Sequence, residues 1–182
     1  MAVSAEHGFP LWLGVSRLLR SWSVAGTSES GVIEGIRRGM TEQVQTGNQA
    51  GAPVGFGLLA DTYLLLGDVR HAAGAVEAGL ALSEQSGTRV WDAELHRLRG
   101  EIHLRHDPPN HAEAERSFRE ALATAQRRGM KMFELRSAVR LARLMSARGR
   151  HEETEALRVL YRSFTEGFDT PGLAEARAFL EG

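Results

Sequence analysis

Cysteine is absent from this chain of 182 residues, and lysine occurs only once, at Lys131. The missing thiols exclude disulfide frameworks, thiol catalysis, zinc knuckles and iron–sulfur sites. The single lysine is not part of a Gly-x-x-x-x-Gly-Lys-Ser/Thr segment, so the chain lacks the loop that cradles nucleotide phosphates. The 22 basic and 23 acidic side chains give a net charge of −1, which argues against a protein built to neutralise phosphates.

Long apolar runs are also missing. The first 15 residues lack the basic region of a signal peptide, and the longest uncharged window, 43–60, is too polar to cross a bilayer. The apolar fraction of 42% and the charged fraction of 25% are typical of a globular chain. We therefore expect a cytoplasmic location and no membrane partner.

What the chain does contain is a repeat of about 40 residues. Gly47, Gly87 and Gly129 lie 40 and 42 residues apart. Eleven residues before each glycine stands a bulky apolar residue, and eight residues before it stands a small one. A further small residue precedes each of these sets. The bulky residues are Ile36, Val76 and Phe118, and the small ones are Gly39, Gly79, Ala121, Ser21, Ala60, Gly100 and Ala142. Spacings of three, four and seven residues share one face of a helix, so each repeat is expected to hold two helices.

These landmarks predict an all-α fold without strands. The expected repeats are 9–47, 51–87, 90–129 and 131–166, followed by a capping helix at 171–181. The expected helices are 9–25, 29–46, 52–66, 69–86, 90–106, 111–128, 131–148 and 151–166. Glycine suits the turns after these helices, Asp68 and Asn110 suit N-caps, and Thr170 precedes Pro171 as a helix start does. Small residues let paired helices approach closely. We predict one domain, 1–182, built as a right-handed α-α superhelix of about four helix pairs.

Several segments carry a family resemblance. The second repeat matches the tetratricopeptide pattern at Phe56, Leu59, Ala60, Tyr63 and Gly67. Longer matches are EHGFPLWLG (6–14), WDAELHRLRGEIHL (91–104), AEAERSFREALATAQRRG (112–129), ELRSAVRLARL (134–144) and FTEGFDTPGLAEARAFL (164–180). Together they resemble the C-terminal tetratricopeptide-like region of bacterial multidomain signalling proteins. Those proteins join a class III adenylate or guanylate cyclase domain to a predicted ATPase domain.

The resemblance implies a regulatory module for protein–protein interaction, with no catalytic activity, cofactor or metal of its own. Its partner would be a protein or peptide, such as the cyclase and ATPase domains of a parent protein. One alternative is an effector sensor for a small ligand or for a metal held by His96, His103, His106 and His111. A second alternative is a nucleic-acid-contacting regulator. Its basic residues would be Arg127, Arg128, Lys131, Arg136, Arg140, Arg143, Arg148 and Arg150.

The first helix of each tetratricopeptide pair lines a groove for partners. Transferring the groove positions of that family predicts a surface that is apolar at its N-terminal end and rich in arginine at its C-terminal end. Such a surface suits an amphipathic helix or an acidic peptide. The predicted groove residues are Trp22, Asp61, Leu64, Leu65, Arg97, Glu101, Arg105, Arg136, Val139 and Arg143. The competing interpretation is that the apolar members are core. Phe9 and Trp12 would form an apolar N-terminal face that permits self-association.

Overall fold

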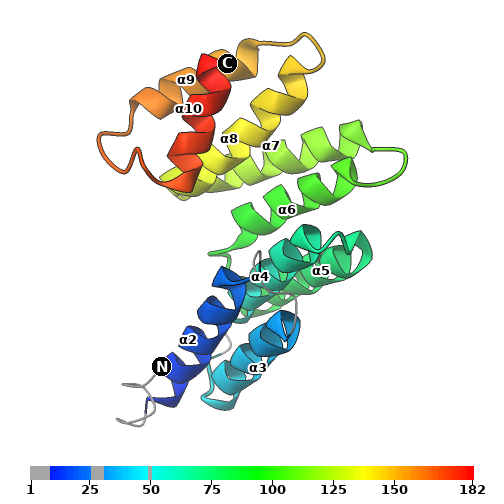
Figure 1. Ribbon diagram of the computed structural model, residues 1–182, viewed down its shortest axis with the longest axis vertical. Coiled ribbons are helices and arrows are strands. Elements are labelled where there is room, and N and C mark those ends of the chain that lie inside the picture. Colours follow the sequence, from blue (N-terminus) through cyan, green and yellow to red (C-terminus); the bar gives the residue numbers. More distant parts are fainter. Residues whose placement is uncertain (1–8, 26–30, 49–50) are drawn as a thin grey trace. The chain divides into compact units, whose positions relative to one another are not determined.

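The computed structural model describes residues 9–25, 31–48 and 51–182, and every regular element within them is an α-helix (Figure 1). This confirms the all-α prediction. The helices in chain order are α2 (Pro10–Ser23), α3 (Val32–Gln45), α4 (Ala52–Leu65), α5 (Val69–Ser86), α6 (Asp92–Leu104), α7 (His111–Arg127), α8 (Lys131–Ser146), α9 (Glu152–Arg162) and α10 (Pro171–Glu181). The expected start of the second helix at residue 29 lies outside the described residues.

Glycine ends the helices where the repeat predicts it. Gly47, Gly87 and Gly129 have φ angles of 81°, 72° and 65°, in the left-handed region that side chains with a Cβ disfavour. A residue in this conformation turns the chain away from the helix axis. The repeat spacing therefore reports a physical stop signal at the end of α3, α5 and α7.

Side chains cap two of the helix starts as expected. The Oδ1 atom of Asp68 accepts a hydrogen bond from the backbone N–H of His71 at 3.1 Å, and Asn110 does the same for Glu113 at 3.2 Å. Thr170 precedes α10 as predicted, but its hydroxyl donates backward to the carbonyl three residues earlier, at 2.7 Å. It therefore makes no side-chain cap to α10.

The described chain divides into two compact units, 1–98 and 99–182, and the division falls inside α6. In the first unit α2 packs on α3, α4 packs on α5, and α3 also contacts α4 (Figure 1). Ile36, Val76 and Leu95 are fully buried there. The bulky apolar positions of the repeat thus serve as core residues.

Small residues permit the closest approach within the first unit. A Cβ added to Gly39 on α3 would lie 2.8 Å from the carbonyl oxygen of Gly14 and from the amide nitrogen of Leu18, both on α2. Side chains cannot yield at these points because the neighbouring atoms are backbone. The α2–α3 pair therefore requires glycine at position 39.

We expect Gly39→Ala to lower the free energy of unfolding by about 1–3 kcal/mol, because the two helices must separate to admit the methyl group. The matched control is Gly74→Ala on α5, where an added Cβ meets no atom within 4 Å. Alanine should raise stability there by about 0.5–1 kcal/mol through helix propensity. Urea denaturation followed by circular dichroism measures both changes. Equal effects at the two positions would contradict close packing at Gly39.

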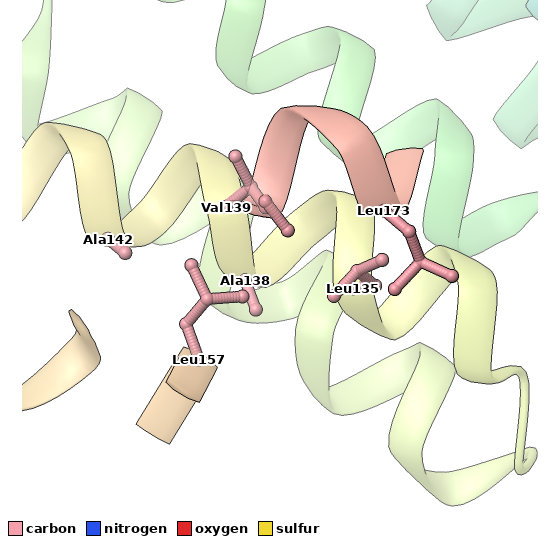
Figure 2. Close-up of a cluster of buried hydrophobic side chains, with 7 residues drawn as sticks. Leu135, Ala138, Val139, Ala142, Leu157 and Leu173 are labelled. Atoms are coloured by element: carbon pink, nitrogen blue, oxygen red, sulfur yellow. The ribbon is translucent and has the colours of Figure 1, made fainter. Parts of the chain in front are cut away.

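The second unit is built around α8. Helices α7, α9 and α10 all pack on it. Leu157 of α9 and Leu173 of α10 form one almost wholly buried cluster with Leu135, Ala138 and Val139 of α8 (Figure 2). The capping helix predicted at 171–181 is thus present as α10 and completes this core.

Candidate functional site

Three predicted groove residues come together on the surface of the first unit. The Nε1 atom of Trp22 on α2 donates to Oδ2 of Asp61 on α4 at 2.9 Å. Leu65 lies one helical turn after Asp61, on the same face of α4. The side chains of Trp22 and Leu65 are 37% and 62% exposed. We call this exposed apolar surface with its central carboxylate the Trp22 patch, and it comprises Trp22, Asp61 and Leu65.

Three other predicted groove residues are buried. Leu64 is 7% exposed, and Val139 is part of the α8 core in Figure 2. Arg97 is only 4% exposed, because its guanidinium forms a bidentate pair with Glu94 at 3.0 and 2.8 Å. These three side chains are part of the packed interior. Two of them, Leu64 and Val139, are apolar core residues, as the competing interpretation predicts.

The predicted groove on α8 is covered by the chain's own last helix. Arg143 pairs with Glu175 of α10 at 3.3 Å and lies over the ring of Phe179. Arg136 lies beside Gly172, whose added Cβ would be 3.8 Å from its Cγ atom. Together with Val139, all three α8 positions therefore face α10. Arg143, which was predicted to hold an acidic peptide, has an intramolecular carboxylate there.

The remaining two groove residues, Glu101 and Arg105, form an ion pair one helical turn apart, at 2.9 Å. Glu101 also binds Arg140 of α8 at 2.7 Å, and Arg140 in turn binds Glu175. This network ties α6, α8 and α10 together within the second unit. Its charges are largely satisfied inside the chain.

A pocket that sequence reasoning missed lies between α3, α4 and α5. It is open to solvent, has a volume of about 700 Å³, and we call it the Arg37 pocket. Its lining residues are Arg37, Met40, Thr41, Phe56, Leu59, Tyr63, Arg70, His71, Gly74 and Ala75. In the sequence, Tyr63 is identified only as a match to the tetratricopeptide pattern. No local pattern places it beside Arg37, which is 26 residues away in sequence.

Polar contacts order one side of the Arg37 pocket. The Nη2 atom of Arg37 donates to the hydroxyl of Tyr63 at 3.0 Å, and the Tyr63 ring stacks on His71 with centroids 5.3 Å apart. The Nδ1 atom of His71 lies 2.6 Å from Oδ2 of Asp68. The pKa of Asp68 lies below its usual value because its carboxylate accepts hydrogen bonds from the backbone and the ring of His71. Since that carboxylate is ionised, Nδ1 carries the donated hydrogen.

The histidines of the third repeat do not assemble a metal site. The rings of His103 and His106 are 5.5 Å apart in an edge-to-face arrangement. Within the described residues, no group of three or more potential ligands from His, Asp or Glu is suitably placed for a metal ion. These observations give the metal-sensing alternative no support.

The environment of the His103 side chain leads us to expect that the stability of the fold depends on pH. The pKa of His103 is lowered by burial, then by the charge of His106 and to a smaller extent by those of Arg99 and Arg116, whereas the charge of Glu113 acts in the opposite direction. The folded state therefore prefers neutral His103, and the unfolded state binds more protons. Stability is fully present above about pH 6.5, the ordinary histidine value, and falls as the pH drops toward the lowered pKa.

We expect the melting temperature to fall less between pH 7.5 and pH 5.5 in His103→Gln than in the wild-type chain. Differential scanning calorimetry at several pH values measures this difference. The exposed His111→Gln variant serves as control and should keep the wild-type slope. An unchanged slope in His103→Gln would contradict the burial effect.

The basic residues of the fourth repeat are interleaved with acids in space. Arg148 and Arg150 both approach Glu115, at 3.4 and 3.5 Å, and Lys131 pairs with Glu134 at 2.9 Å. Such pairs reduce the positive charge that phosphates would meet. The nucleic-acid alternative therefore gains no support from this surface.

Among the helices of the described residues, none combines the length and the apolar character needed to cross a membrane. Comparison with protein-family models and with curated proteins gives no match to this chain. The family resemblance thus rests on the sequence segments quoted above.

Proposed function

We propose that this chain is a tetratricopeptide-like interaction module without catalytic activity. Its helix pairs would stack as a right-handed α-α superhelix, and its exposed surface would bind a protein or peptide. The observation that carries this proposal is the Trp22 patch, where a partly exposed tryptophan and a largely exposed leucine flank a carboxylate. Large aromatic side chains held in one orientation are typical of residues that dominate binding energy at interfaces.

The patch favours a partner helix that is amphipathic. Trp22 and Leu65 offer an apolar surface, and the Asp61 carboxylate keeps acceptor capacity beyond its bond to Trp22. A complementary helix would present apolar residues three or four positions apart, with an Arg or Lys opposite Asp61. The family resemblance suggests that this partner belongs to a cytoplasmic bacterial signalling assembly with cyclase and ATPase domains.

Isothermal titration calorimetry with purified class III cyclase and ATPase domains from a protein of the resembling family tests the proposal. We expect one of the two domains to bind the intact chain. Trp22→Ala and Leu65→Glu should each weaken binding by about 2 kcal/mol, or roughly 30-fold. The control is Val159→Glu on α9, where the wild-type side chain is 70% exposed and lies outside the patch. It should bind like the wild type.

Absence of binding to both domains by a folded chain would contradict the proposed partner class. Equal losses in the patch variants and the control would contradict the patch as the binding surface. Self-association remains a distinct hypothesis for Phe9 and Trp12, which are 52% and 60% exposed, and sedimentation of the chain alone measures it. The effector-binding alternative is favoured by a different observation, the Arg37 pocket.

A further inference from the structure

The Arg37 pocket lies on the side of α4 opposite to the Trp22 patch. Phe56 and Tyr63 are seven residues apart and share one face of α4, whereas Asp61 and Leu65 are rotated about half a turn away at 100° per residue. The pocket is formed wholly by α3, α4 and α5 of the first unit. A ligand in this pocket would therefore leave the patch accessible.

The charge on the pocket wall is positive. None of the described residues that line the pocket is acidic, whereas two of them, Arg37 and Arg70, are basic. The guanidinium of Arg37 meets the neutral hydroxyl of Tyr63. The guanidinium of Arg70 forms no hydrogen bond or ion pair within the described residues. The nearby carboxylate of Asp68 feels its charge but is bonded to His71. Two guanidinium groups therefore face one open pocket, and guanidinium groups bind carboxylates and phosphates with paired hydrogen bonds.

The other wall of the pocket is apolar and aromatic. Met40, Phe56 and Leu59 line it, and the Tyr63 ring is held flat against His71. A volume of about 700 Å³ lies within the range of small-molecule sites. The Tyr63 hydroxyl accepts from Arg37 and keeps its own hydrogen to donate. The combination suits a molecule with one anionic end and one apolar ring.

We infer that the Arg37 pocket is a binding site for a small organic anion, a carboxylate or phosphate that carries an aromatic or aliphatic group. The anionic end binds Arg37 and Arg70, and the apolar end packs against Phe56 and Met40. This site goes beyond the proposed partner binding and makes the chain a ligand-binding module as well. Its recognition chemistry does not depend on the Trp22 patch.

Nuclear magnetic resonance titration of the full chain with indole-3-acetate and with phenyl phosphate tests the inference. We expect saturable shifts of pocket amides for at least one of them, with a dissociation constant in the millimolar range or below. The neutral analogue indole-3-acetamide and inorganic phosphate should each bind at least tenfold more weakly. The two organic probes distinguish a carboxylate ligand from a phosphate ligand.

Two sets of variants locate the site. Arg37→Gln combined with Arg70→Gln should weaken binding at least tenfold, whereas the exposed Arg128→Gln should leave it unchanged. Gly74 lines the pocket, and a Cβ added there meets no atom within 4 Å. Gly74→Leu should therefore fill the pocket and abolish binding without disturbing the fold, and Gly74→Ala should keep binding. Thermal denaturation confirms that each variant is folded.

The inference is overturned if neither organic anion binds saturably, or if indole-3-acetamide or inorganic phosphate binds equally well. It is also overturned if the double arginine variant and Gly74→Leu retain wild-type affinity. Trp22→Ala should bind the anion like the wild type. The test of the Arg37 pocket and the test of the Trp22 patch can therefore fail or succeed independently.

Discussion

Replacing Phe118 with alanine is expected to lower the free energy of unfolding by about 3–5 kcal/mol. Phe118 is completely buried in the second unit, in a cluster with Leu141 and Met145 of α8. Its ring also fills the space beside Gly100 of α6, where an added Cβ would clash with the ring. Truncation removes contacts with both α6 and α8 and leaves a cavity that the surrounding helices close only partly.

Urea denaturation of the intact chain measures this loss, with Val159→Ala on the exposed side of α9 as control. The pairing with Gly100 provides a sharper test. Gly100→Ala should destabilise the wild-type chain, because the ring must move, and should cost much less in the Phe118→Ala chain, which has room for a methyl group. Additive effects of the two substitutions would contradict the contact between α6 and α7.

Replacing Arg97 with alanine is expected to cost a similar amount, about 3–5 kcal/mol. Arg97 and Glu94 are both nearly inaccessible to solvent, and two hydrogen bonds join them along α6. The substitution leaves the Glu94 carboxylate buried without its bidentate guanidinium. An exposed pair of the same spacing would be worth far less, because water would replace the lost partner.

The double variant Glu94→Met, Arg97→Met identifies the cause of this loss. If the stranded carboxylate causes the loss, two apolar residues of similar length should recover most of it. Arg105→Ala is the surface control, since the Glu101–Arg105 pair is partly exposed, and a change of no more than about 1 kcal/mol is expected. Chemical denaturation compares the three variants. A loss below 1 kcal/mol for Arg97→Ala would show that the buried pair does not stabilise the fold.

Much of the helical layout could be predicted from sequence because its signals are local. Helix α5 has the expected bounds of 69–86, and α10 has the expected bounds of 171–181. In both, the start is marked by Asp68 or by Thr170 and Pro171, and Gly87 ends α5 in a left-handed conformation. Such signals act within one turn of a helix, so a single sequence suffices to read them.

The candidate surfaces were harder to predict because they depend on contacts between helices. Arg97 occupies a groove position in the repeat, yet its side chain is buried in an ion pair with Glu94, three residues earlier. The α8 positions are predicted to line a groove because the sequence does not show that α10 packs over them. The Arg37–Tyr63 contact joins residues from different repeats. Each outcome is set by helix rotation and side-chain rotamers, which periodicity does not encode.

Hydrogen–deuterium exchange of the chain, alone and bound to the cyclase or ATPase domain that it binds, tests partner recognition most directly. The proposal predicts slower exchange in the complex at the ends of α2 and α4 that carry Trp22, Asp61 and Leu65, with α9 unchanged. A complex that protects only α9 or α10, and leaves α2 and α4 exchanging at their free rates, would contradict it.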